Sequence, residues 1–236
     1  PWQGLRASSA LPSPPPLKAR GKGRPAAARA RLQVRPEDFH VRRYQERSET
    51  TTVFVVDASG SAALRRLAEA KGAVELLLAD CYVRRDSVAL VAFRGAGAEV
   101  LLPPTRSLVR ARRSLAALPG GGGTPLASGL DAAFGVADAV RRRGDLPLLV
   151  LLTDGRANIA RSGEPGRDQA EADARQSARL WRAAGLSALV VDTSVRPHPL
   201  ARQLADEMGA AYLPLPQADA HGLSAAVGGA LNAQRR

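Results

Sequence analysis

The stretch Thr51-Thr-Val-Phe-Val-Val-Asp-Ala-Ser-Gly-Ser61 decides the fold that this 236-residue sequence predicts. Its apolar run, residues 53–56, is short and β-branched and lacks polar alternation, which is typical of a strand buried on both faces of a parallel sheet. Asp57, Ser59 and Ser61 follow where this strand ends. Open α/β sheets bind ligands at the carboxyl ends of their strands, and hydroxyl and carboxylate oxygens suit a hard divalent cation. The stretch therefore predicts an α/β fold with a metal site at the sheet edge.

Strands and helices alternate along the rest of the chain. Helical periodicity begins at residue 62 and reaches Cys81, and later helices are predicted near 106–118, 125–143, 169–184, 198–208 and 220–233. Further strands are predicted at 87–93, 98–102, 147–153, 187–192 and 211–214. The short turn at Gly95 and Gly97 indicates a hairpin, and hence one antiparallel edge strand. The alternation predicts a sheet covered by helices on both faces.

Composition divides the chain into three parts. Residues 1–33 are rich in proline and basic residues and have no periodicity, which predicts a largely disordered linker. Residues 34–47 are predicted to form an extended arm, and residues 48–236 a single α/β domain. The formal net charge is +12, and +7 of it falls within residues 1–50, which hold 11 Lys/Arg and 4 Asp/Glu. The linker is therefore the most basic part of the chain.

Such a charge attracts nucleic acid, acidic membranes or acidic protein surfaces. We favour a solvated linker over a nucleic-acid role, because no recognition module or aromatic platform accompanies the charge. No apolar run approaches the roughly 18 residues needed to cross a bilayer. The single cysteine, Cys81, fits a reducing compartment and is expected to be a buried small residue. Without an initiator Met or a signal peptide, the sequence predicts a fragment of a longer cytoplasmic protein that does not bind membranes.

Three predicted loops place oxygen ligands at the carboxyl ends of strands. The first carries Asp57, Ser59 and Ser61, and the third carries Asp154 directly after the most apolar strand. The second carries Thr124 after four glycines, and this threonine is also predicted to cap the next helix. Each loop alone is a weak signal, since a glycine-rich loop before a helix is equally typical of phosphate binding.

Together, the three loops resemble the metal-ion-dependent adhesion site of von Willebrand factor A, or integrin I, domains. The resemblance implies a doubly wound, mostly parallel six-stranded sheet with one antiparallel edge strand. It also implies that Ser59, Ser61 and Thr124 coordinate Mg²⁺ or Mn²⁺, that Asp57 and Asp154 act through waters, and that a carboxylate from a partner protein fills the open position. The alternative is that the serines only cap the first helix, while the second aspartate caps its turn.

A second resemblance covers residues 57–61, 67–85, 101–107 and 120–126 and the segment Arg35-Pro-Glu-Asp-Phe39. These segments are similar to magnesium-chelatase D subunits of the bacteriochlorophyll-forming type. That family inserts Mg²⁺ into protoporphyrin IX with ATP, using an ATPase I subunit and a porphyrin-binding H subunit. The resemblance implies a non-catalytic, metal-dependent interaction domain with these two partners. ATP is expected only in the complete complex, because the sequence has no phosphate-binding Gly-x-x-x-x-Gly-Lys-[Ser/Thr] loop.

Two other functions remain open from the sequence. An autonomous enzyme could use Asp57 and Asp154 for metal-assisted phosphoryl transfer, but a second acid after the first aspartate and a nearby general base are lacking. The histidines His40, His198 and His221 lie in the arm and in late helical regions. The chain could also belong to another chelatase linked to an AAA+ ATPase, such as cobaltochelatase. We expect the interaction domain.

Overall fold

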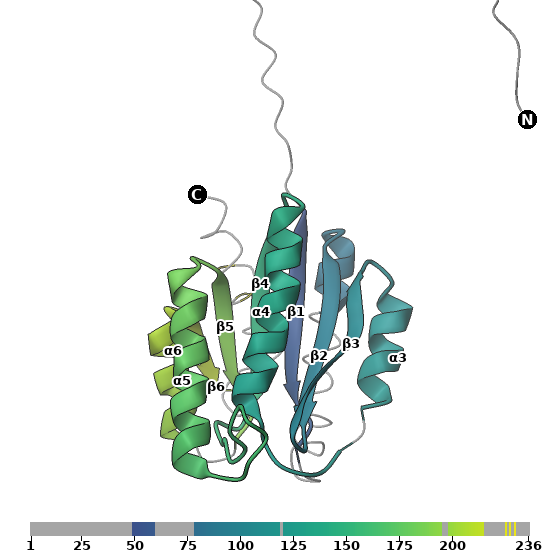
Figure 1. The fold of residues 1–236 in the computed structure, drawn as a ribbon. Helices are drawn as coiled ribbons and strands as arrows, with labels where there is room; N and C mark the ends of the chain where they lie inside the picture. Colours follow the sequence, from purple (N-terminus) through teal and green to yellow (C-terminus); the bar gives the residue numbers. More distant parts are fainter. Residues whose placement is uncertain are drawn as a thin grey trace, which may run out of the picture. The chain divides into compact units, whose positions relative to one another are not determined.

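The computed structural model describes residues 49–59, 78–118, 120–194 and 198–214, together with residues 225, 227 and 229. These residues contain one sheet of six strands in the order β3-β2-β1-β4-β5-β6 (Figure 1). The strands are β1 (Thr50–Asp57), β2 (Ser87–Arg94), β3 (Gly97–Thr105), β4 (Leu146–Thr153), β5 (Ser187–Asp192) and β6 (Ala211–Pro214). All neighbouring strands are parallel except β2 and β3, which pair antiparallel. The predicted doubly wound, mostly parallel sheet with one antiparallel edge strand is therefore confirmed.

Both faces of the central strands are buried, which explains their unbroken apolar sequence. Because successive side chains of a strand point to opposite faces, Val53 and Val55 of β1 join one core cluster, whereas Phe54 and Val56 join the other. The long apolar strand β4 divides in the same way. The sheet is thus the shared wall of two cores.

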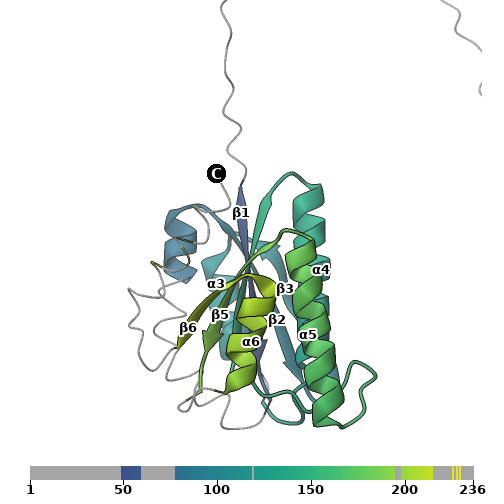
Figure 2. The ribbon, with the colours of Figure 1, turned by 90° about the vertical axis from the view of Figure 1, so that its left-hand side faces the viewer.

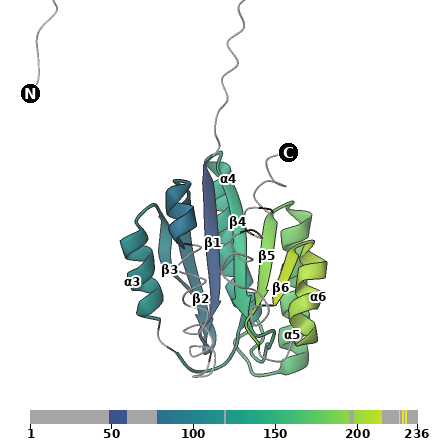
Figure 3. The same ribbon diagram turned by 180° about the vertical axis from the view of Figure 1, so that it is seen from behind.

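Among the described residues, helices lie on both faces of the sheet. The first face carries α4 (Leu126–Arg142), α5 (Arg167–Ala183) and α6 (Pro199–Met208), most of whose buried apolar side chains belong to the same core cluster (Figure 2). The second face carries α3 (Leu108–Ala116) and a helical stretch at residues 78–83, which contains the buried Cys81 (Figure 3). No helix in the described parts of the chain has both the length and the apolar character of a membrane span.

The strand order positions the candidate site. From β1 the chain moves to β2 on one side, and it later returns to β4 on the other side. The direction of winding reverses between β1 and β4, and such a switch point leaves a crevice at the carboxyl ends of the two strands. Asp57 ends β1, and Asp154 follows the last residue of β4. Two of the predicted site residues therefore lie at the switch point.

Three differences between the element boundaries and the sequence predictions have a clear physical reason. β1 begins earlier, at Thr50, because three buried threonines continue the strand. β3 runs through Pro103 and Pro104 to Thr105, which an edge strand tolerates because one side of it forms no ladder. The predicted helix near 106–118 is shorter and is capped by Ser107, whose hydroxyl accepts from Arg110 N at 3.4 Å. The helices predicted to begin at residue 62 and near 220–233 lie largely outside the described residues, and the predicted linker and arm lie entirely outside them.

Gly129 lets α4 approach the sheet closely. A Cβ atom at this position would lie 2.6 Å from Cδ1 of the fully buried Phe93. Gly129→Ala is therefore expected to lower the free energy of unfolding by about 1–3 kcal/mol, the usual cost of overpacking a core. Urea denaturation measures the change.

Gly135 provides the matched control on the same helix. A Cβ atom there meets nothing within 4 Å, so Gly135→Ala should stabilise α4 by up to about 1 kcal/mol through helix propensity. Equal effects of the two substitutions would contradict the proposed close contact with Phe93.

Candidate metal centre

The turn after β1 is fixed by its own aspartate. Asp57 is 5% exposed, and its Oδ1 accepts a hydrogen bond from Ser59 N at 2.8 Å. Ala58 N donates to Phe93 O of the neighbouring strand at 3.1 Å. These bonds hold the chain as it leaves the sheet, and they define where the Ser59 hydroxyl lies.

The second predicted loop meets this turn. Gly121 N donates to Ala58 O at 3.0 Å, and the Thr124 hydroxyl donates to Ser59 Oγ at 2.7 Å. The last contact joins two hydroxyl groups that are 65 residues apart in the sequence. This hydrogen bond brings the first and second predicted ligand loops together.

The prediction that Thr124 caps α4 is wrong. The N-cap residue is Pro125, which has no side-chain capping bond, and the helix starts at Leu126. The Thr124 side chain is instead directed to Ser59, and 5% of the residue is exposed. Its hydroxyl therefore belongs to the site rather than to the helix.

The four glycines allow three loops to approach one another closely. A Cβ atom on Gly122, whose φ is +91°, would lie 2.8 Å from Gly95 Cα. A Cβ atom on Gly123 would lie 2.4 Å from Cγ1 of Ile159. These close approaches explain the glycine run through packing among protein loops, so phosphate binding is not needed to account for it.

The third predicted ligand, Asp154, lies in the loop after β4. It is 8% exposed, and its Oδ1 accepts from Arg156 N at 3.1 Å. The Arg156 side chain is 72% exposed, and its Nε lies 3.9 Å from Asp154 Oδ2. Asp154 thus caps its own turn, which agrees with the alternative that its carboxylate has a capping role. It also lies close to the positively charged Arg156 side chain.

The loop after Asp154 contains residues that sequence reasoning missed. Asn158 Oδ1 accepts from Thr124 N at 2.6 Å. Arg161 Nη2 donates to Ser177 Oγ, and its Nε donates to Asp131 Oδ2, both at 2.8 Å. This loop therefore contacts the second ligand loop and is anchored on α4 and α5.

A third acid at the carboxyl edge of the sheet forms hydrogen bonds with other residues of this chain. Asp192, which ends β5, is fully buried, and its Oδ1 accepts from Ser194 N at 2.9 Å and from Ser194 Oγ at 2.5 Å. Its Oδ2 accepts from Tyr212 OH at 2.6 Å. Burial and this hydrogen bond raise the pKa of Tyr212 to about 12. Asp192 therefore fixes the β5 and β6 strand ends and is separate from the candidate ligands.

The residues at the switch point fit a hard cation. Two hydroxyl groups lie in contact, and two nearly buried carboxylates stand at the ends of the adjacent strands. Mg²⁺ prefers oxygen ligands and keeps several waters. Among the described residues, no group of three His, Cys, Asp or Glu side chains could hold a metal. The predicted ligand Ser61 lies outside the described residues.

Comparison with known proteins identifies the class of this domain. Residues 52–156 match the von Willebrand factor type A domain family. A solved von Willebrand factor type A structure from Catenulispora acidiphila has a TM-score of 0.51 at 21% identity, covering 75% of this chain and 41% of that chain. The chain therefore contains a domain of the von Willebrand factor type A family.

The sequence relatives point to a particular protein. The chain is 55% identical over 200 residues to the magnesium-chelatase 60 kDa subunit of Cereibacter sphaeroides, covering 85% of this chain and 36% of the relative. It is 48% identical over 233 residues to the magnesium-chelatase 60 kDa subunit of Rhodobacter capsulatus, covering 99% and 39%. The chain is a homologue of magnesium-chelatase 60 kDa subunits, and it spans little more than a third of their length.

Asp173 links the stability of the anchored loop to pH. The main-chain N–H of Arg161 donates to the Asp173 carboxylate at 2.8 Å and lowers the pKa of Asp173. Burial raises this pKa, and the hydrogen bond from the Gln169 amide lowers it further. A carboxylate whose pKa is depressed on folding stabilises the folded state above its unfolded pKa, about 3.9, and this contribution is lost as the pH falls through the folded pKa. Asp173→Asn should therefore destabilise the chain by about 1 kcal/mol at pH 7.

The difference between Asp173→Asn and the wild-type chain should shrink as the pH falls from 4 toward 2, since both side chains are then uncharged. Urea midpoints measured across this range test the sign. The exposed Asp206 on α6 supplies the control substitution, Asp206→Asn. A difference that stays constant with pH would contradict the role of the Asp173 charge.

Proposed function

We propose that this domain is a non-catalytic, metal-dependent interaction module of a magnesium-chelatase subunit. In this role it helps to assemble the ATP-dependent complex that inserts Mg²⁺ into protoporphyrin IX during bacteriochlorophyll and chlorophyll biosynthesis. The homology to magnesium-chelatase 60 kDa subunits supports a role in such a complex. The hydrogen bond between the Thr124 and Ser59 hydroxyls is the observation that carries the metal-dependent role.

The proposed metal ligands are the hydroxyl oxygens of Ser59, Ser61 and Thr124. Asp57 and Asp154 would act through water molecules and supply negative charge. Hydroxyl ligands are neutral, so a bound Mg²⁺ or Mn²⁺ supplies an electrophilic position that attracts a carboxylate. We propose that an acidic residue of a partner protein provides this carboxylate.

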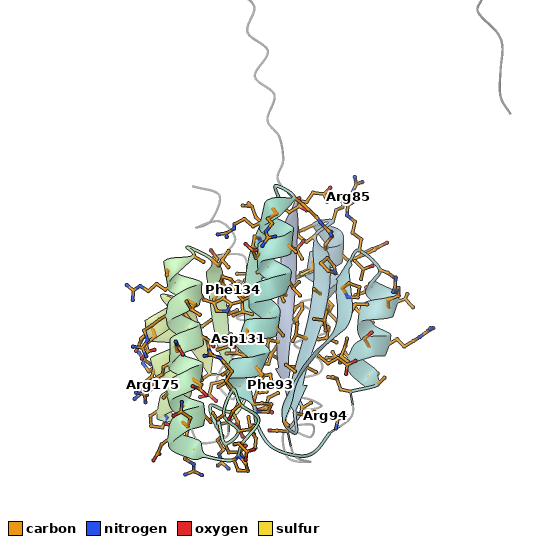
Figure 4. All side chains as sticks on the ribbon, viewed as in Figure 1. Arg85, Phe93, Arg94, Asp131, Phe134 and Arg175 are labelled. Atoms are coloured by element: carbon orange, nitrogen blue, oxygen red, sulfur yellow. The ribbon has the colours of Figure 1, made fainter. Side chains whose placement is uncertain are left out.

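Two arginines at the carboxyl edge favour an acidic partner. Arg156 is adjacent to Asp154, and Arg94 ends β2 beside the Asp57 turn (Figure 4). Both are exposed. Positive charge around a binding site speeds association with a negatively charged surface and suppresses wrong partners. The rim is therefore complementary to the same acidic partner that the metal would bind.

The described surroundings favour binding over catalysis. The His198 side chain accepts a hydrogen bond from Leu200 N at 3.3 Å and caps α6. This ring nitrogen is therefore used in the fold, and it lacks the free lone pair that a general base requires. We accordingly assign ATP hydrolysis and porphyrin chemistry to other parts of the complex, and we propose the I and H subunits as partners in the cytoplasm.

Capture of purified I and H subunits by the tagged chain tests this proposal. Wild-type protein should retain at least one of the two in Mg²⁺ and lose it in excess EDTA. Asp57→Ala and Ser59→Ala should reduce capture at least tenfold while circular dichroism stays unchanged. Ser162→Ala, in an exposed loop, is the control. Undiminished capture in EDTA would refute the metal-dependent mechanism.

The arginine rim gives a separate prediction. Arg156→Gln should weaken capture by about two- to fivefold and reduce its dependence on salt, because rim charges act mainly on association rates. Arg179 is similarly exposed and lies 3.6 Å from Glu207, so Arg179→Gln is the matched control. Surface plasmon resonance at several salt concentrations measures both effects, and identical behaviour of the two variants would contradict the role of the rim.

A further inference from the structure

Thr124 is held at both of its main-chain groups by the loop after β4. Its N–H donates to Asn158 Oδ1 at 2.6 Å. Its carbonyl oxygen accepts from Asn158 N at 3.2 Å and from Ile159 N at 3.4 Å. The Asn158 side chain and main chain therefore enclose the peptide groups on either side of the Thr124 Cα atom.

No local helix cap fixes this segment. Pro125, the N-cap residue of α4, offers no side-chain hydrogen bond. An N-cap side chain usually accepts from an N–H group in the first turn of its own helix. Asn158 instead accepts from Thr124 N, one residue before the N-cap, and it comes from 34 residues further along the chain. The position of Thr124 consequently depends on the loop that carries Asn158.

That loop is closed and anchored. Gly166 N donates to Asn158 O at 2.9 Å, and Ile159 pairs with Pro165 across the loop. Arg161 fixes the loop to the helices, since it donates from Nε to Asp131 of α4 and from NH1 to Gln176 of α5 at 2.8 and 2.9 Å. Figure 4 shows Asp131 on the part of α4 that faces α5. The support for Asn158 thus comes from two packed helices.

We infer that Asn158 is a positioning residue that fixes the Thr124 hydroxyl for metal binding. The χ1 angle of a threonine is restricted, so a fixed main chain, together with the hydrogen bond to Ser59, limits where its Oγ1 atom can lie. Loss of a group that orients a metal ligand typically lowers metal affinity by about 10- to 100-fold. This inference rests on the proposed function, since it assumes that Thr124 binds the ion.

Titration with Mn²⁺ alone, followed by electron paramagnetic resonance, tests the inference on the full chain. Asn158→Ala should weaken Mn²⁺ binding by about tenfold, the lower end of the usual effect of an orienting group. Asn158→Asp keeps an oxygen acceptor for Thr124 N and should restore binding to the wild-type level or above. Ser162→Ala, in the same loop, should bind as the wild type does.

A double-substitution cycle separates positioning from a general structural role. Thr124→Ala removes the hydroxyl, so adding Asn158→Ala should then weaken Mn²⁺ binding by less than twofold. The stability loss from Asn158→Ala, measured without metal, should persist in both backgrounds. A tenfold effect on Mn²⁺ binding in both backgrounds would overturn the inference, because it would show that Asn158 does not act through the Thr124 hydroxyl.

The outcomes also separate this inference from the proposed function. Equal Mn²⁺ affinity of the wild type and Asn158→Ala overturns the positioning role and leaves the metal site intact. Failure of the wild-type chain to bind Mn²⁺ overturns both. Asn158 is exposed, so we expect Asn158→Ala to fold; if it does not, Asn158→Gln, which displaces the amide by one methylene, takes its place with the same expected loss.

Discussion

The hydrogen bond between the Thr124 and Ser59 hydroxyls requires two distant loops to meet at one edge of the sheet. The meeting depends on the reversal of winding between β1 and β4, because ligands of open α/β sheets usually bind at such a switch point. It also depends on glycines, since a side chain on Gly123 would collide with Ile159. The topology brings the loops to one edge of the sheet, and the glycines let them pack closely.

The two cores make this polar edge possible. The central strands are buried on both faces and pair with neighbours on both sides, so they form a rigid base. The strand ends can therefore hold buried carboxylates and hydroxyls, which would destabilise the protein if they lay inside the apolar core. Asp192 shows the structural use of such a group, since its oxygens are bonded to Ser194 and Tyr212. For the hydroxyl pair and Asp57 we propose a different use, the binding of a cation.

Much of the fold and part of the site could be predicted from the sequence. The apolar runs and the hairpin turn predict the strands of the sheet, because a buried strand can be recognised from its own short apolar sequence. Thr124 was predicted as a ligand by resemblance but was also assigned to a helix cap, because Thr-Pro before a helix has that local meaning. Asn158 and Arg161 could not be identified, since their partners lie on other loops and helices. Local patterns predict elements, whereas a side chain that supports a site from a distance is defined only by tertiary contacts.

A crystal of the chain grown with Mn²⁺ and measured for anomalous scattering shows directly whether these loops bind a metal. We expect an anomalous peak within about 2.5 Å of Ser59 Oγ and Thr124 Oγ1, the range of a metal–oxygen bond. The peak should disappear in Asp57→Ala. A peak elsewhere, or a well-ordered site that remains without metal at millimolar Mn²⁺, would contradict the claim that these loops form a metal centre.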